Sequence, residues 1–600
     1  MMQPPPTPGQ TPSLILIEGL ATCVFVALSF LLPRLAGNWF TRIERTLGQL
    51  ARRQSLSVAV VGCAAFLLRL AILPICPIPL PFVPDDFSFL LAADTFAHGR
   101  LSNPMPAMWT HFESIHLTMS PTYVSMYFPS NGLLLAASKV LFGHPWYGLL
   151  IASSLMCAAI CWMLQAWLPP TWALLGGGLA ILRLGLFSYW INTYSGGGCI
   201  SALGGALILG SLPRLKKTMQ LKYALLLAIG IVLLVITRPY EGLLLCLPAA
   251  GYLLHWLVFS ANRPSPALAM RLAVVPLALV IAGMSWLGYY DYRAFGKSTT
   301  LPYTVDRAAY AQAPYYVWQA PQPAPAYRHA VMQQFYSVNE LQAYQQIHTA
   351  SGFVPQTLGK VLRGLIFFAG LALLPPLIVM RRVFMDRRVR FLIVCLGVLM
   401  AGMLIQIFLI PHYIAPFTAL FYAIGLQAMR HLRVWNPDGQ PVGRTMTRLT
   451  VTLCVGMAAL RLCAAPLHLM PEKWPPSNWI NQWYGPGPFG VERARVQSTL
   501  EHMPGKQLVL VRYARKHEVL DEWVYNSANL DDSKVIWARE MDAAHDRELL
   551  AYYPDRHVWL VEPDAGDPKL SNYVVPETRP ISTLMISSVP SDESKKESHD

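Results

Sequence analysis

Long runs of apolar residues recur along most of this 600-residue chain. A helix needs roughly 17 to 25 apolar residues to cross the hydrocarbon core of a bilayer. Only 13% of the residues are charged, about half the share expected of a soluble protein. The runs lie at residues 13–33, 55–80, 145–167, 171–190, 197–212, 221–237, 240–259, 272–290, 358–380, 391–410, 412–429 and 449–467. They predict a polytopic all-α membrane protein with about twelve transmembrane helices.

Basic residues are concentrated in alternate connections between the runs, and the chain has a net charge of +14. Such connections face the cytoplasm in membrane proteins. They contain Arg34, Arg42, Arg45, Arg52 and Arg53; Arg214, Lys216, Lys217 and Lys222; Arg263 and Arg271; Arg381, Arg382, Arg387, Arg388 and Arg390; and Arg430, Arg433, Arg444 and Arg448. The opposite connections, expected outside, begin at Asp85, Ile191, Arg238, Asp291, Pro411 and Leu467. The positive charge thus indicates topology, and no nucleic-acid partner is predicted.

Residues 1–54 are expected to form an N-terminal transmembrane helix and a cytoplasmic loop. The start, 1–13, is neutral and proline-rich and lacks the basic segment and cleavage site of a secretory signal, so the helix should be retained. Residues 55–469 form the expected membrane domain. Two long external loops, 85–143 and 291–356, should project from it.

The two loops differ in composition. Loop 85–143 alternates apolar and polar residues at helical spacing, which favours short helices along the membrane surface. Loop 291–356 is rich in tyrosine and proline, and a loop of this length is usually functional or disordered. Its aromatics favour an ordered cover over the membrane face, with an interfacial aromatic belt as the alternative.

Residues 470–586 are expected to form a small external α/β accessory domain after a linker rich in Pro, Gly and Trp. Strands are predicted at 507–513, 534–538 and 557–562, with a helix at 542–552. Strands that alternate with helices suggest βαβ units, and no glycine motif for a nucleotide follows any of them. The tail, 587–600, has too little apolar surface to fold.

Two adjacent carboxylates, Asp85 and Asp86, open the first external loop. Acidic residues at the edge of a membrane are costly to keep near lipid, which makes them candidates for function. The structural alternative is that Asp85 caps a helix starting at Phe87, since aspartate is a favoured N-cap residue. The two roles are compatible.

The residues around this pair resemble a known family. Segment 84–101 begins Pro-Asp-Asp and continues as an expected helix toward His-Gly-Arg-Leu, and segment 127–132 reads Tyr-Phe-Pro-Ser-Asn-Gly. This arrangement resembles the GT-C superfamily of integral-membrane glycosyltransferases, which includes the bacterial aminoarabinose transferase that modifies lipid A and the protein O-mannosyltransferases. The sequence departs from the family pattern at Asp86, where Glu is usual, at Ser130, where a second proline is usual, and at 191–195, which lacks an acidic residue.

The resemblance implies transfer of a sugar from a polyprenyl-phosphate donor to a lipid, glycan or protein acceptor in one inverting displacement. It places the reaction on the external face of the bacterial cytoplasmic (inner) membrane, with membrane lipids as further partners. A base must take the proton of the acceptor while the phosphate leaves. Asp85 matches the catalytic position of the family, and Asp86 would orient the acceptor or assist.

A phosphate leaving group also needs positive charge or hydrogen-bond donors. Arg183 lies inside an apolar run, where charges are rare and usually functional, and Arg238 ends a run on the outer side. For Arg238 the alternative is a snorkelling interface residue. His412 and Tyr413 resemble a pair that the family places at an external helix end, and are expected near the lipid phosphate.

His111, Glu113 and His116 stand close together in the first external loop. Their spacing differs from that of a zinc-binding helix, where two histidines stand four residues apart, so recognition of a polar acceptor is favoured over metal binding. Tyr127 is also assigned to substrate binding. The sequence assigns no cofactor and leaves a divalent cation open.

A transporter or flippase of lipid-linked saccharides is the competing function, because it would also need membrane arginines and a polar cavity. Transporters tend to have duplicated halves and helices broken at mid-membrane. The sequence shows no duplicated halves, and its acidic pair lies outside the membrane core. A non-catalytic scaffold on a transferase fold is a third alternative. It would be indicated if Asp85 had no part in any activity.

Overall fold

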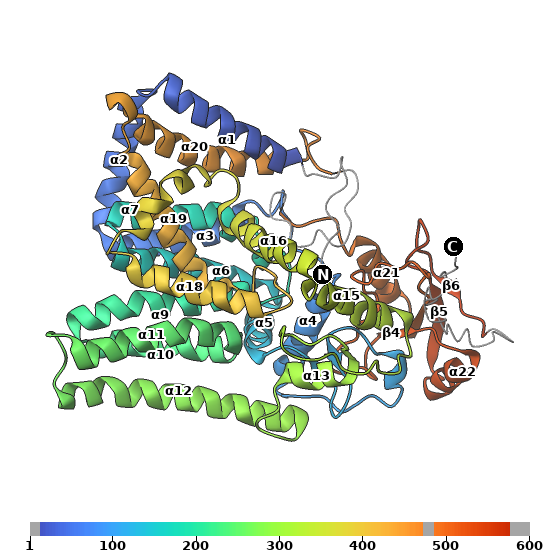
Figure 1. Cartoon of the computed structure of the whole chain (residues 1–600). Helices are drawn as coiled ribbons and strands as arrows, with labels where there is room; N and C mark the ends of the chain where they lie inside the picture. The colour runs from blue at the N-terminus through green and yellow to red at the C-terminus, as the bar shows by residue number, and fades with distance from the viewer. Residues whose placement is uncertain (1–12, 472–484, 576–600) are drawn as a thin grey trace, which may run out of the picture.

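The computed structural model describes residues 13–471 and 485–575. Long helices are stacked on one side of the molecule, and the C-terminal strands lie at the opposite end (Figure 1). Shorter helices from the two long loops lie between these parts. The predicted tail, 587–600, and most of the predicted linker lie outside the described residues.

Every apolar run of the sequence contains a helix. These helices are α1 (Ser13–Leu31), α3 (Gln54–Ala71), α6 (Trp146–Trp167), α7 (Pro170–Ala180), α9 (Gly198–Thr218), α10 (Leu221–Val235), α11 (Pro239–Phe259), α12 (Pro266–Phe295), α16 (Ala350–Ala369), α18 (Arg390–Ile405), α19 (Thr418–Arg433) and α20 (Val442–Leu462). Within the described residues six are long and apolar enough to cross a membrane, namely α1, α3, α6, α9, α11 and α12. The prediction of a multi-pass membrane protein is confirmed.

The count of about twelve spans is not confirmed, because several runs are interrupted. The run at 171–190 contains the π-helix η2 (Ile181–Gly185) and the single turn α8 (Tyr189–Asn192). In the run at 412–429, α19 begins only after the short helix η5 (Ala415–Phe417). A proline, here Pro416, lacks the N–H that a helix interior requires. Hydropathy alone does not register such breaks, so the number of spans stays a prediction.

Helices α6 and α9 form the centre of the helical part. Their apolar windows are 72% and 78% buried, against 6% for α12. A Cβ on Gly205 of α9 would lie 1.8 Å from the carbonyl oxygen of Pro416, so only glycine allows this close approach. Small residues at helix contacts are the usual basis of packing in lipid. The exposed apolar side chains of α12 suit contact with lipid.

The two predicted loops are folded into short elements. The first contains α4 (Pro84–Ala97), η1 (Trp109–His111), the antiparallel strands β1 (Leu117–Thr118) and β2 (Val124–Ser125), and α5 (Pro129–Phe142). The second contains α13 (Pro302–Tyr310), α14 (Ala330–Gln333), η3 (Gln334–Asn339) and α15 (Glu340–Ile347). The short helices expected in the first loop are present. Their position at the membrane surface stays a prediction.

The C-terminal region is a small α/β unit, as predicted. Its sheet has the order β4 (Val535–Arg539), β3 (Lys506–Val511), β5 (Arg556–Val561) and β6 (Ser571–Asn572), and its first three strands are parallel. Side chains of a strand alternate between the faces of a sheet. Val509 and Trp537 therefore pack with residues of α21 (Val491–His502), whereas Leu508 and Ile536 pack with α22 (Ala543–Tyr552) on the other face.

This unit shares its core with the first loop. The cluster that contains Leu508 also buries Leu91 of α4 and Phe112. Tyr525 stacks on Phe87 of α4, with ring centroids 4.7 Å apart. The C-terminal unit thus packs directly on the helix that carries the acidic pair, which gives it a part in positioning that pair.

The remaining helices connect the helices of the bundle along the chain. They are α2 (Gly37–Arg52), η4 (Pro375–Val379), α17 (Met380–Phe384) and η6 (Pro437–Gly439). Glu44 ties α2 to α19 and α20, because it accepts hydrogen bonds from Arg433 at 2.9 Å and from Arg448 at 3.0 Å. Burial raises the pKa of Glu44, but the hydrogen bonds and charges of the two arginines outweigh it and lower the pKa to about 2.

We expect Glu44→Gln to lower the melting temperature of the detergent-solubilised protein at pH 7, with Gln49→Ala on the same helix as control. The folded-state pKa of about 2 lies below the ordinary value of 4.5, so this stabilisation is present above pH 4.5 and is lost as the pH falls toward 2. Because the Glu44 side chain is 36% exposed, solvent screening limits the effect to about 1 kcal/mol or less. Thermal unfolding at pH 7 and pH 3 checks this. If the melting temperatures of wild type and Glu44→Gln differ by the same amount at both pH values, this expectation is contradicted.

Candidate functional site

The two carboxylates lie in the first turn of α4. Pro84 occupies the first helical position, where its fixed φ suits a helix start, and Val83 is the N-cap. The helix therefore begins before Asp85, and the alternative that Asp85 caps a helix starting at Phe87 is wrong. Carboxylates are also favoured here by the positive end of the helix dipole.

Asp85 is held by two side chains of the same loop. Tyr127 donates its hydroxyl hydrogen to Asp85 Oδ1 at 2.5 Å, and His116 Nδ1 lies 3.4 Å from Asp85 Oδ2. The same nitrogen lies 3.0 Å from the Tyr127 hydroxyl oxygen, which closes a triangle of three groups. The structure thus brings together three of the residues that the sequence predicted for the site.

The triangle keeps Asp85 ionised. Burial raises the pKa of Asp85, but the charge of His116 and hydrogen bonds from His116 and Tyr127 outweigh it and lower the pKa to about 2. The residue is 8% exposed. A buried carboxylate that stays charged at neutral pH is able to accept a proton from a bound group.

The Asp86 side chain points into the protein and accepts hydrogen bonds from two backbone N–H groups. The N–H of Tyr194 donates to Asp86 Oδ1 at 2.9 Å, and the N–H of Phe82 donates to Oδ2 at 3.4 Å. Burial and the neighbouring charge of Asp85 raise the pKa of Asp86 to about 7. Because Asp86 has no exposed surface, these contacts suit a residue that fixes the connection 191–195 against α4.

Arg238 brings positive charge to the same region. Its guanidinium carbon lies 4.4 Å from the centroid of the Tyr413 ring, and Nη2 donates to the carbonyl of Gly196 at 3.5 Å. Thr237, the residue before Arg238, shares a hydrogen bond of 2.5 Å with Ser130 of the first loop. Arg238 is 5% exposed, so the protein encloses it, unlike a residue that snorkels to the lipid interface.

His412 lies beside Tyr413 and is fixed by Tyr189. Its Nδ1 lies 2.7 Å from the Tyr189 hydroxyl oxygen, which also accepts the backbone N–H of His412 at 3.0 Å. Gly196 packs against the imidazole with φ of +90°, and a Cβ there would lie 2.7 Å from the ring. Both the backbone conformation and the space therefore require glycine. Tyr189 was not predicted, because a tyrosine in an apolar run carries no signal that separates it from packing.

Arg183 has different surroundings. It lies in η2, pairs with Glu18 of α1 at 3.5 Å, and donates to the carbonyl groups of Phe367 and Ile366 on α16. These contacts join three parts of the helical bundle. They give no support to the predicted role of Arg183 toward phosphate.

His111 and Glu113 lie where the first loop meets other parts of the chain. His111 Nδ1 lies 3.0 Å from the carbonyl oxygen of Arg539 in the C-terminal unit. Glu113 accepts the hydroxyl hydrogen of Tyr310 at 3.0 Å. The structure therefore places these two residues at interfaces and His116 at Asp85.

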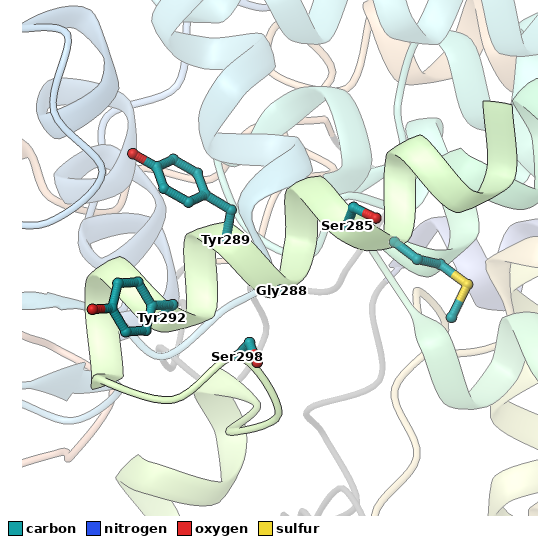
Figure 2. A pocket seen from close by; sticks show the side chains of 6 residues that line it. Ser285, Gly288, Tyr289, Tyr292 and Ser298 are labelled. Carbon is teal, nitrogen blue, oxygen red and sulfur yellow. The ribbon is translucent and has the colours of Figure 1, made fainter. Parts of the chain in front are cut away.

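A separate hollow of about 580 Å³ lies along α12. Figure 2 shows Tyr289 and Tyr292 on this helix and Ser298 in the turn that follows it. Its lining, Met284, Ser285, Gly288, Tyr289, Tyr292 and Ser298, includes no residue that the sequence predicted for the site.

Metal binding has no defined ligand set in residues 13–471 and 485–575. No three His, Cys, Asp or Glu side chains in these ranges are grouped to hold an ion. Both oxygens of Asp85 already contact Tyr127 and His116.

No family profile and no curated protein sequence matches this chain. Among solved structures, the Archaeoglobus fulgidus oligosaccharyltransferase in complex with Zn and sulfate is similar over 84% of this chain and 67% of that one, with a TM-score of 0.43 and 10% identity. The archaeal oligosaccharyltransferase AglB from the same organism, in complex with an inhibitory peptide and a dolichol-phosphate, is similar over 84% and 69%, with a TM-score of 0.36 and 12% identity.

Proposed function

We propose that this protein is a membrane glycosyltransferase that moves a sugar from a polyprenyl-phosphate donor to an envelope acceptor on the external face of the bacterial cytoplasmic membrane. The observation that supports this most directly is the ionised Asp85, held by Tyr127 and His116, with the buried Arg238 in the same region. One inverting displacement needs a proton acceptor and a cation for the departing phosphate. These residues supply both.

In this mechanism the acceptor oxygen or nitrogen attacks the anomeric carbon as the bond from that carbon to the phosphate oxygen breaks. The electron pair of that bond goes to the phosphate, whose charge Arg238 balances. The proton of the acceptor goes to Asp85. Because the pKa of Asp85 is about 2, it is a weak base, and the proton moves late, once the attacking atom has bonded to the sugar and become acidic.

Mass spectrometry of envelope lipids and glycans from cells with and without the gene tests the function. We expect one component to lose a single sugar residue, and wild-type protein to restore it. In detergent, the purified protein should release polyprenyl phosphate from a synthetic polyprenyl-phosphate hexose or pentose. An unchanged envelope together with no release would contradict the proposal, whereas movement of the intact lipid-linked sugar without release would indicate the transporter.

Topology gives an independent prediction. In a background without native cysteines, Ser298→Cys should react with a membrane-impermeant thiol reagent in intact spheroplasts. Gln440→Cys should react only after permeabilisation, because it lies in a connection rich in arginine. Both positions are exposed, so access to the reagent depends on the side of the membrane. The reverse pattern would place Asp85 in the cytoplasm and contradict the use of an external donor.

A further inference from the structure

His116 has a backbone conformation that its surroundings must enforce. Its φ is +66°, in the left-handed region that residues other than glycine rarely adopt. Its carbonyl oxygen accepts the hydroxyl hydrogen of Ser88 at 2.7 Å and the N–H of Met126 at 3.2 Å. Its own N–H donates to the hydroxyl oxygen of Tyr336 at 3.3 Å. Strained residues persist where several contacts determine them, and one of these contacts comes from segment 291–356.

Tyr336 connects His116 to a second buried carboxylate. The Tyr336 hydroxyl donates to Asp306 Oδ2 at 3.1 Å while it accepts the His116 N–H. Tyr336 and Asp306 have no exposed surface. Asp306 Oδ1 has no hydrogen-bond partner in the described part of the chain. A buried carboxylate in this state is costly unless a cation compensates its charge.

The neighbouring arginine is already engaged. Arg307 forms a double hydrogen bond with Glu340, at 3.1 Å and 2.9 Å. Asp306 and Glu340 thus share one arginine, and one negative charge is left over. Burial raises the pKa of Asp306 to about 6, while the charges of the His116 imidazole and of Arg307 act in the opposite direction.

Charges of carboxylates from two segments act on the imidazole of His116. Asp85 and Tyr127 of the first loop contact the ring, and Tyr336 of segment 291–356 accepts the backbone N–H. The charges of Asp306 and Glu340 also act on the ring from that segment. Burial lowers the pKa of His116, but the charges of Asp85, Asp306 and Glu340 and the hydrogen bond with Asp85 outweigh it and raise the pKa. The protonated imidazole suits this position.

We propose that Asp306 and Tyr336 are positioning residues that hold the protonated imidazole of His116 against Asp85, so that segment 291–356 completes the catalytic centre. Asp306 supplies the charge that favours the imidazolium, and Tyr336 fixes the backbone of His116. The effect on turnover rests on the proposed function. The effect on His116 does not.

Three variants separate these roles. Asp306→Asn removes the charge, and Tyr336→Phe removes the bridging hydroxyl. Tyr327→Phe is the matched control, because it removes a half-buried hydroxyl of the same segment that bonds to Tyr310 and Ser337. The imidazole of His116 is titrated by NMR in full-length protein with isotope-labelled histidine in micelles, and His116→Gln assigns its signal. Turnover is measured on the same samples.

We expect Asp306→Asn to lower the pKa of His116 and to reduce kcat roughly 10- to 100-fold, as misplaced catalytic groups do, with the donor KM unchanged. Asp306→Glu should restore part of the His116 pKa and part of kcat. Tyr336→Phe should move the His116 resonance and lower kcat, whereas Tyr327→Phe should change neither.

An unshifted His116 titration in Asp306→Asn would overturn the proposal. If that variant does not fold, Tyr336→Phe decides, because a His116 resonance that moves no more than in Tyr327→Phe would also overturn it. If the wild-type protein shows no transfer but Asp306→Asn shifts the titration, the proposed function fails and the assignment of Asp306 stands.

Discussion

Asp85→Asn should abolish sugar transfer while the protein still folds and inserts. The amide keeps the shape of the carboxylate and an oxygen that accepts the Tyr127 hydroxyl, but it cannot take the proton of the acceptor. Loss of a general base costs on the order of 100- to 10,000-fold in rate. Release of polyprenyl phosphate, measured beside size-exclusion profiles and melting temperature, checks both halves of this expectation.

Asp86→Asn is the matched control for this variant. Asp86 has no exposed surface and binds the backbone of Phe82 and Tyr194, and an asparagine retains one acceptor oxygen for these groups. The loss should therefore be milder than for Asp85→Asn. If folded Asp85→Asn turns over at the wild-type rate, Asp85 is not the base. If Asp86→Asn loses more activity than Asp85→Asn, the base is Asp86.

Arg238→Ala should weaken use of the phosphate-linked donor. A hydrogen bond to a charged group contributes about 1.5–3 kcal/mol, which corresponds to roughly 10- to 100-fold in kcat/KM for the donor. Arg238→Lys should be intermediate, since it keeps the charge and loses the forked geometry. Rates measured at increasing donor concentration and fixed acceptor concentration give this kcat/KM.

Arg183→Ala provides the contrast. It removes the cation that pairs with Glu18 inside the bundle, and breaking a buried pair destabilises by about 3–5 kcal/mol. The melting temperature should therefore fall, with donor kinetics little changed in the protein that remains folded. If Arg183→Ala impairs donor use and Arg238→Ala does not, Arg183 and not Arg238 is the cation that binds the phosphate.

The triangle at Asp85 could be predicted because its members are close in sequence. Asp85, His116 and Tyr127 all lie in one loop, and two motifs of the resemblance, 84–101 and 127–132, overlap it. Arg183 shows what this reasoning cannot supply. Hydropathy reveals a charge in an apolar run, but its partner Glu18 lies on the first helix of the chain. Sequence spacing cannot indicate which distant helix supplies a counter-charge.

Asp306 and Tyr336 were missed for the same reason. Tyr336 stood out only as one of many aromatics in a long loop, and Asp306 had no neighbouring motif. Their contact with His116 joins segments about two hundred residues apart. The strands of the C-terminal unit, by contrast, were predictable from local apolar runs. The attachment of that unit to α4 was not, because the stack of Phe87 on Tyr525 looks in sequence like two unrelated aromatics.

That attachment has a consequence for biosynthesis. Helix α4 and its acidic pair leave the ribosome early, while the sheet that covers Leu91 and Phe112 is translated only after the membrane helices. Under the proposed topology, a nascent chain carries Asp85 across the membrane long before the surface that packs on α4 has been synthesised. Under the proposed function, an unfinished copy in the translocon stays inert toward donor lipid, and the C-terminal sheet acts as the last step of assembly.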